Sequence, residues 1–275
     1  MKKVNNNPKG ISQDFLKLSI QVSLNGLSFC ILDTIKNTVL LSEKKTFDIT
    51  LTPYKLLKEV KDLFKKHSIS QKEFSEVIVI HQNKLFGLVP KPLFNPEELP
   101  NYIKFNAKIL ASDHIDFDEI AGYDMVNVYV PFVNINNYIY ELFGDFIFKH
   151  IGTVLIESLL KNHTNGKSPV CYVHVSEKNM DIVIISQKKL LLYNSFSFDT
   201  KEDFLYYLLF ALEQLNLDAE SVILRLFGSI EEDDEIYALC YEYIKHISIF
   251  VPTGASHPFI DAASENIDFA ILNSL

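Results

Sequence analysis

An acidic segment with one histidine, SDHIDFDE at residues 112–119, mixes side chains that could bind a metal. Its carboxylates and the imidazole of His114 offer the oxygen and nitrogen donors that divalent cations prefer. The ligand spacing of a calcium loop is absent, however, and an exposed acidic loop accounts for the same residues. We therefore predict no metal site in this segment.

Two further segments group residues that occur in catalytic or metal sites. EEDDE (231–235) stands where a helix begins, and the helix dipole stabilises acids in a first turn without any ligand. SHPFID (256–261) contains a serine, a histidine and an aspartate, but a triad is defined by geometry and no strained nucleophile turn surrounds this serine. His81 and His174 lie in apolar strands and are expected to be hydrogen-bonded core residues. No catalytic residue is predicted.

Composition narrows the class of protein. The 35 acidic and 26 basic residues give a formal net charge of −9, and without a basic stripe we expect no nucleic-acid partner. No apolar run approaches the roughly 20 residues of a membrane span. The polar residues 1–14 are expected to be a disordered tail. Cys30, Cys171 and Cys240 are far apart in apolar segments, which indicates reduced thiols and a cytoplasmic location.

The first half of the chain predicts a strand meander followed by a helix and a strand. Alternating apolar residues with turn residues between them favour strands over 18–22, 27–32 and 38–47. Thr52 before a proline is a good helix cap, and apolar residues follow at three- and four-residue spacing. The nearly all-apolar segment 75–82 is typical of a strand buried on both faces.

The second half repeats this order after about 150 residues. Thr200 with Asp203 resembles a capping box at the start of a strongly apolar helix. Within that helix, FLYYLLFALEQL (204–215) predicts burial first, and an apolar patch shared with a partner is the second interpretation. The repeated elements are three strands, a helix and a strand, over 170–176, 180–186, 189–198, 201–217 and 221–228.

The strongest linker signal is TNGKSP, at residues 164–169. We therefore divide the chain into the tail 1–14, a first subdomain over 15–164 with an inserted loop and helices, and a second subdomain over 165–275.

Two such units face to face resemble the ribonuclease-H-like fold in its duplicated form, the actin-like ATPase architecture of sugar kinases, actin and heat-shock ATPases. More narrowly, the chain is similar to a Bacteroidetes family known as a domain of unknown function with this fold. The resemblance spans roughly residues 15–260 and implies an α/β protein of two ribonuclease-H-like β-β-β-α-β-α-β units in a degenerate actin-like ATPase fold. The segments that carry it are KLFGLVPKPLF, YIKFN, KLLLYNSFSFDTKEDFLYYLLFALEQLNLD and GSIEEDDEIYALCYEYI.

The resemblance also implies what the hairpin turns should contain. In nucleotide-binding members of the fold, each turn has an acid for hydrated magnesium and a glycine that admits the phosphates, followed by Thr or Ser. Here the first turn is VSLNGLS, in which Asn25-Gly26 is what a two-residue hairpin turn prefers for backbone reasons alone. The second turn, VSEKNMD, has Lys178 and Asn179 where glycine is expected. Both turns therefore look degenerate.

The residues that could still contact a nucleotide are few. Ser28 remains in the first turn, Glu177 and Asp181 remain near the second, and Gly254 is the single glycine of the one candidate adenosine segment, PTGASHP. A nuclease is disfavoured because the first and fourth strands lack the carboxylates that would hold two metals.

We expect a non-catalytic scaffold or protein-interaction protein, without a cofactor, that binds a protein partner through the interdomain cleft or an exposed helix. The alternative is a divergent ATP-binding protein or weak ATPase that holds ATP and Mg²⁺ in the cleft through the four residues just named. Retained acids lining one continuous cleft would favour the alternative, and a cleft filled by Phe and Tyr would argue against it. Homodimerisation is left open.

Overall fold

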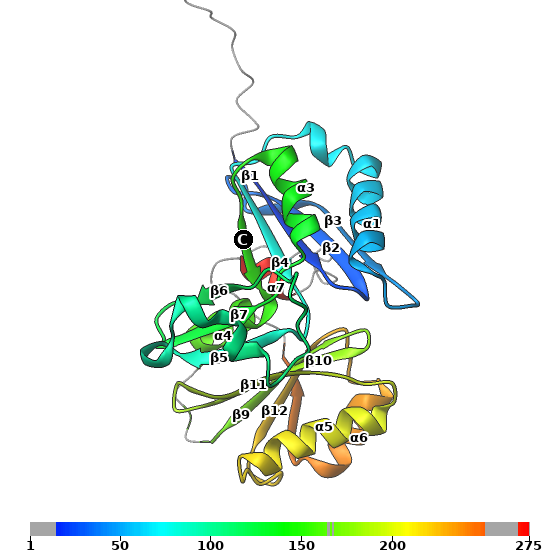
Figure 1. Cartoon of the computed structure of the whole chain (residues 1–275). Helices are drawn as coiled ribbons and strands as arrows, with labels where there is room; N and C mark the ends of the chain where they lie inside the picture. Colours follow the sequence, from blue (N-terminus) through cyan, green and yellow to red (C-terminus); the bar gives the residue numbers. More distant parts are fainter. Residues whose placement is uncertain (1–14, 164–165, 167, 251–268, 275) are drawn as a thin grey trace, which may run out of the picture.

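Two five-stranded sheets with the same strand order form the frame of the molecule (Figure 1). The structure is a computed structural model that describes residues 15–163, 166, 168–250 and 269–274. In each sheet the first three strands are antiparallel, and the fourth and fifth run parallel to the first. The first sheet has the order β3 (Thr38–Thr46), β2 (Gly26–Asp33), β1 (Leu16–Val22), β4 (Glu76–His81), β8 (Ile147–His150). The second has the order β11 (Lys189–Ser197), β10 (Asn179–Ser186), β9 (Val170–Ser176), β12 (Ile223–Gly228), β13 (His246–Ile249). The predicted duplication is confirmed.

Each sheet carries a pair of helices on its outer face. Helices α1 (Pro53–Lys66) and α3 (Val133–Phe143) pack on the first sheet, and α5 (Lys201–Gln214) and α6 (Glu235–Tyr243) pack on the second. The predicted caps are confirmed: the Thr52 side chain accepts a hydrogen bond from Lys55 N–H, and Thr200 forms a capping box with Asp203. We call each sheet with its outer helices the first unit and the second unit.

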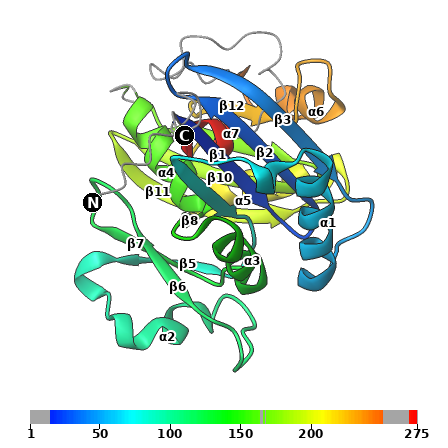
Figure 2. The same ribbon diagram turned by 90° about the horizontal axis from the view of Figure 1, so that it is seen from above.

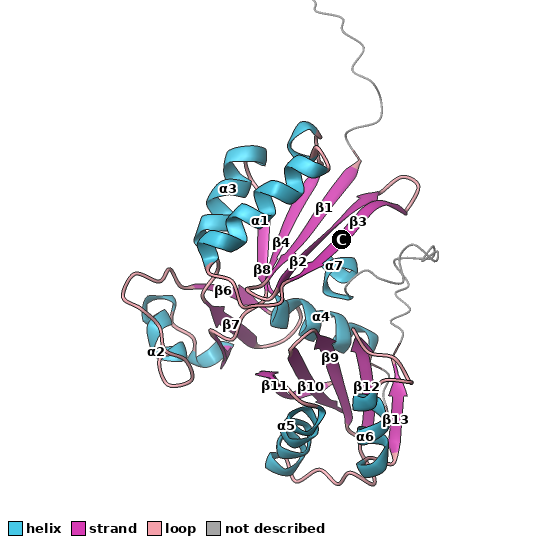
Figure 3. Cartoon of the chain, turned by 90° about the vertical axis from the view of Figure 1, so that its right-hand side faces the viewer, coloured by secondary structure: helices cyan, strands magenta, loops and turns pink. Residues whose placement is uncertain are grey.

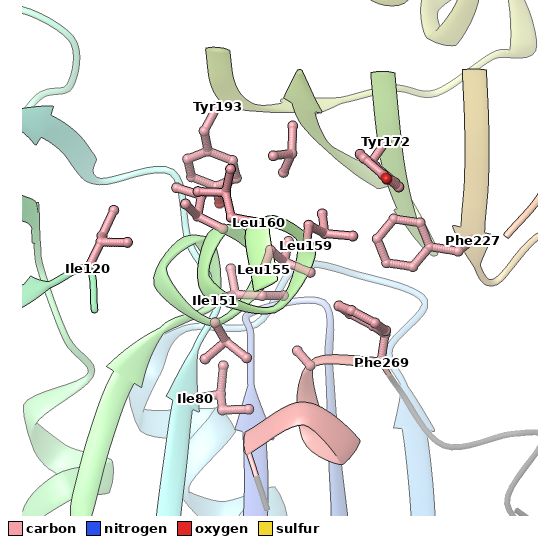
Figure 4. Packing of buried hydrophobic residues seen from close by; sticks show 14 of the residues in the cluster. Ile80, Ile120, Ile151, Leu155, Leu159, Leu160, Tyr172, Tyr193, Phe227 and Phe269 are labelled. Atoms are coloured by element: carbon pink, nitrogen blue, oxygen red, sulfur yellow. The ribbon is translucent and has the colours of Figure 1, made fainter. Parts of the chain in front are cut away.

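A central layer joins the two units. Helix α4 (Ile151–Asn162) and the short helix α7 (Phe269–Ser274) lie between the sheets (Figures 1 and 3). Figure 4 shows α4 surrounded by side chains from both sides, with Ile80 of the first sheet below it and Tyr172, Tyr193 and Phe227 of the second sheet above it. The units therefore share one apolar core.

An inserted subdomain projects from the first unit (Figure 2). Its three-stranded sheet has the order β5 (Phe86–Pro90), β7 (Met125–Tyr129), β6 (Asp116–Glu119), with α2 (Leu99–Ile103) packed against β5 and β7. The 3-10 turns are η1 (Ile69–Gln71), η2 (Lys91–Leu93) and η3 (Pro96–Glu98). The expectation of an exposed acidic loop over 112–119 is wrong for its second half, because residues 116–119 form β6.

Two of the predicted boundaries remain predictions. The tail 1–14 lies outside the described residues. The division between residues 164 and 165 also stays a prediction, and α7, which falls in the predicted second subdomain, packs against β1, β2 and β4 of the first sheet. The last described helix thus returns to the first unit.

Candidate functional site

The β1–β2 turn and the β9–β10 turn meet around a cavity of about 30 Å³. This volume is close to that of one water molecule, whereas small-molecule pockets measure roughly 300–1,000 Å³. The space directly between the two turns is therefore too small for a nucleotide. Its lining residues include Ser23, Gly26, Ser28, Lys44 and Gln82 of the first unit and Ser176, Glu177 and Asn179 of the second.

The first turn is held by the side chain of Ser23. Its hydroxyl oxygen accepts hydrogen bonds from Asn25 N–H (3.2 Å) and Gly26 N–H (2.9 Å). The favoured two-residue hairpin turns need a positive φ at one or both central residues, and neither Asn25 nor Gly26 has one, so the prediction of such a turn centred on these residues is wrong. The glycine instead eases a close approach of the backbone, because a Cβ at position 26 would lie 3.0 Å from the carbonyl oxygen of Lys45.

The second turn contributes to an ion pair that closes the cavity. Glu177 adopts a left-handed conformation with φ of 34°, and its carboxylate lies 3.2 Å from Lys44 Nζ on β3. Lys44 Nζ also donates a hydrogen bond to Ser229 Oγ, at 2.7 Å, just beyond β12. One lysine of the first unit thereby contacts two elements of the second unit.

A buried amide network lies beneath this ion pair. Gln82, at the end of β4, accepts a hydrogen bond from Gln21 (3.1 Å) through its Oε1. Its Nε2 donates to Ser176 Oγ at 3.1 Å and to Asp181 Oδ2 at 3.3 Å. The two units are thus joined by polar side chains where a bound phosphate would need open space.

Asp181 is fully buried and serves this network. Its Oδ1 accepts a hydrogen bond from Tyr193 OH at 3.3 Å, and its Oδ2 lies 3.5 Å from His174 Nδ1. Burial, together with the Asp181 charge, raises the pKa of Tyr193 well above its ordinary value, so Tyr193 remains a neutral donor. Asp181 does not line the cavity. Its carboxylate is engaged by protein groups.

The four predicted nucleotide contacts therefore have different positions. Ser28 and Glu177 line the same small cavity, Asp181 lies in the core behind it, and Gly254 falls outside the described residues. Sequence reasoning missed Lys44 and Gln82. The sequence did contain a signal for Gln82. This polar residue directly follows the buried strand β4 (Glu76–His81), whose end lies beside the hairpin turns.

Two larger grooves exist on the described surface. One measures about 1,110 Å³ and runs between β8, α4 and the β6–β7 turn. The other measures about 800 Å³ and lies beside α1, the β4–β5 loop and the start of α3. It adjoins the small cavity, with which it shares Ser23, Asn25, Gln82 and Asn179. Neither groove is lined by Ser28, Glu177 or Asp181. The three predicted nucleotide contacts among the described residues thus line neither groove.

His81 and His174 are buried and have hydrogen-bond partners in the core, as predicted for both. His81 Nδ1 accepts a hydrogen bond from Phe132 N–H at 3.2 Å, and its Nε2–H donates to Asn136 Oδ1 at 2.9 Å. Burial lowers the pKa of His81 to about 3, although the bond to Asn136 acts in the other direction. His174, also fully buried, packs against Phe227 beside Asp181.

A second polar network, which the sequence did not reveal, links β6 to α4. His150 Nδ1 accepts from Gly152 N–H at 3.1 Å and caps α4, while burial lowers its pKa to about 4. Asp118 accepts from His150 N–H (2.8 Å), Thr153 Oγ1 (2.7 Å) and Tyr129 OH (3.0 Å). Burial nevertheless raises the pKa of Asp118 to about 6. Among the described residues, no three His, Cys, Asp or Glu side chains come together as metal ligands.

The duplicated units around a central helix define an actin-like ATPase fold. The structure resembles a Bacteroides thetaiotaomicron protein described as having an actin-like ATPase fold and unknown function, with a TM-score of 0.80, 23% identity and coverage of 96% of this chain and 97% of the other. It also resembles a chain of the PilM–PilN type IV pilus biogenesis complex, with a TM-score of 0.54, 12% identity and coverage of 94% and 96%.

The family follows from the sequence match. The model of a family described as protein of unknown function (DUF3822) matches residues 5–247, and the chain belongs to this family. A search of curated proteins gave no match. In the described part of the chain, no helix has the length and apolar character needed to cross a bilayer.

Proposed function

We propose that this protein is a non-catalytic interaction or scaffold protein whose actin-like cleft is closed by its own side chains. The observation that carries the proposal is the closure between the hairpin turns. The Lys44–Glu177 ion pair and the Gln82 hydrogen bonds to Ser176 and Asp181 occupy the space in which the fold would otherwise hold phosphates. Only about 30 Å³ remains there.

Two further observations support an interaction role. Tyr193, Tyr172 and Phe227 fill the core between the sheets, together with the buried face of α4. The similar chain belongs, by its own description, to the PilM–PilN type IV pilus biogenesis complex, an assembly of two proteins. We extend that property to this chain as part of the proposal, together with the expected cytoplasmic location. A homodimer is left open.

The first test measures the thermal stability of the intact chain with and without millimolar Mg-ATP, Mg-ADP or Mg-GTP. A ligand that binds only the folded state raises stability by RT ln(1 + [L]/Kd), or about 2.7 kcal/mol at a hundredfold excess over Kd. We expect no change in the melting temperature. A magnesium-dependent increase that is lost in Glu177→Gln would instead establish the divergent ATP-binding alternative.

The second test measures how much the Gln82 hydrogen bonds between the two units stabilise the fold. Gln82→Ala removes the buried hydrogen bonds that Gln82 forms with Gln21, Ser176 and Asp181, so we expect the free energy of unfolding to fall by about 1–3 kcal/mol in urea titrations. Residues kept for ligand binding often behave oppositely, because replacing them leaves stability unchanged or raises it. Gln214→Ala, at an exposed position at the end of α5, is the matched control. Equal stability of the two variants would contradict the proposal.

A further inference from the structure

Helices α5 and α6 expose stacked aromatic side chains on the outer surface of the second unit. On α5, Tyr206 is 62% exposed and Phe210 is 41% exposed, and their rings stack at 6.2 Å with an 18° interplanar angle. On α6, Tyr241 is 66% exposed and stacks on the half-buried Tyr237 at 6.5 Å and 20°. We call these four residues the aromatic face.

The aromatic face is separate from the stripe of α5 that builds the core. Five other residues of this helix face the second sheet and are buried, whereas Tyr206 and Phe210 lie on the opposite side with Glu202 and Glu213. Scattered single apolar residues on a surface need no explanation, but two stacked pairs on neighbouring helices form a patch of the kind that marks interaction sites. The five buried residues are Phe204, Leu205, Leu208, Ala211 and Leu212.

The two pairs lie on neighbouring helices. Helices α5 and α6 contact each other beneath the second sheet (Figures 1 and 3), and Lys201 Nζ forms an ion pair with Glu235 Oε2 at 2.9 Å between their first turns. At a rise of about 1.5 Å per residue, both aromatic pairs begin within about 8 Å of that ion pair along their helix axes.

The surroundings of the aromatic face are strongly acidic. Between residues 201 and 245, eleven acidic residues stand against three basic ones, so this region accounts for most of the formal net charge of −9. Two of the bases are already used: Lys201 pairs with Glu235, and Lys245 pairs with Glu220 at 3.2 Å. The third, Arg225, lies on β12 against the Tyr172 ring. The acids that form no ion pair within the described residues include Glu202, Glu213, Glu232 and Glu242.

We infer that the aromatic face docks a basic amphipathic segment of a partner protein. The combination selects this chemistry: lysine and arginine side chains meet the unpaired carboxylates and the tyrosine rings, while apolar side chains of the segment cover Phe210. Cation–π contacts on exposed rings contribute roughly 0.5–1 kcal/mol each, and electrostatic complementarity adds specificity. The inference rests on the proposed function, since it names the surface and the partner class of an interaction protein.

The absence of tryptophan from the chain allows a direct binding assay. Three synthetic peptides of equal length, each with one tryptophan, are titrated with the intact protein while the peptide fluorescence is recorded. The first is an amphipathic Leu/Lys helix, the second replaces Lys by Glu, and the third replaces Leu by Ser. We expect the first to bind more tightly than the other two by at least about tenfold, and its affinity to fall with added salt.

Two variants locate the binding surface. Tyr206→Ser combined with Tyr241→Ser removes one exposed ring from each helix, and we expect it to weaken binding of the Leu/Lys peptide by about tenfold. Tyr140→Ser is the matched control, because Tyr140 is 61% exposed on α3 of the first unit; we expect its affinity to match that of the parent within about twofold. All of these side chains are exposed, so unchanged melting temperatures should verify that each variant is folded.

Three outcomes would overturn the inference. If the third peptide, with Ser in place of Leu, bound as tightly as the Leu/Lys peptide, the binding would be charge attraction alone. If Tyr140→Ser weakened binding of the Leu/Lys peptide as much as the double variant does, the peptide would have no specific binding surface. Self-association of the chain that the Tyr206 and Tyr241 changes abolish would assign the aromatic face to a second copy. None of these results involves nucleotide, so failure here is distinct from failure of the proposed function, which is decided by the Mg-ATP titration.

Discussion

Replacing Gly152 with alanine is expected to weaken the junction between the two units. Gly152 lies in the first turn of α4, where a Cβ atom would stand 2.2 Å from Tyr193 Cε1 and 2.5 Å from its Cζ. Such contacts are far too short, so the Tyr193 ring has to move. Because Tyr193 OH donates to the buried Asp181 at 3.3 Å, this movement also removes a hydrogen bond from a buried carboxylate.

The magnitude follows from three contributions of different sign. Overpacking a well-filled core typically costs about 1–3 kcal/mol. Loss of a hydrogen bond to a charged group adds about 1.5–3 kcal/mol. Alanine favours a helix over glycine by about 1 kcal/mol, which offsets part of the loss. We therefore expect the free energy of unfolding to fall by roughly 2–4 kcal/mol, given the partial relaxation of the core.

Urea unfolding of the intact chain measures this difference. Gly166→Ala is the control, because a Cβ at position 166 meets nothing within 4 Å, and we expect its midpoint to equal that of the parent. Tyr193→Leu should remove much of the clash, so combining it with Gly152→Ala should cost less than the sum of the two single changes. If Gly152→Ala were as stable as Gly166→Ala, the close contact between α4 and β11 would be wrong.

Acidification and cap removal give two further predictions. The pKa of His81 is lowered to about 3 and that of His150 to about 4, so their stabilising contribution is present above about pH 6.5 and is lost as the pH falls. Asp118, with its pKa raised to about 6, acts oppositely between about pH 6 and 4, which leaves a net loss of about 3 kcal/mol by about pH 4.5. A urea midpoint that stays the same from about pH 6.5 to about pH 4.5 would contradict this prediction. Thr200→Ala should lower the free energy of unfolding by about 1 kcal/mol through loss of the capping box with Asp203, and an unchanged midpoint would show that the cap is dispensable.

Local patterns in the sequence were sufficient to predict the duplicated units. Period-two alternation identified the meanders, and Thr52 and Thr200 identified the helix starts, because caps and strand faces depend on nearby residues. Phe47 and Phe198 occupy corresponding positions, each directly after the third strand of its unit. Phe47 N–H donates to Asn25 O and Phe198 N–H donates to Lys178 O, so each residue forms the corresponding backbone bond to its own hairpin turn.

The same local reasoning was wrong where a residue serves a distant contact. Asn25-Gly26 looked like a primed turn, but its glycine admits the close carbonyl oxygen of Lys45, and Ser23 holds the turn instead. The expected loop around Asp118 is partly a strand, since the carboxylate is ordered by three donors, two of them from the β8–α4 segment.

The sequence by itself determined the two units, the order of their helices and strands along the chain and the degenerate composition of the hairpin turns. Only the tertiary structure decided that the turns close on one another. Lys44 and Glu177 are far apart in the chain and meet because α4 sets the position of one sheet over the other, and Gln82 reaches Ser176 for the same reason. Such contacts depend on the packing between units, which no local pattern of residues encodes.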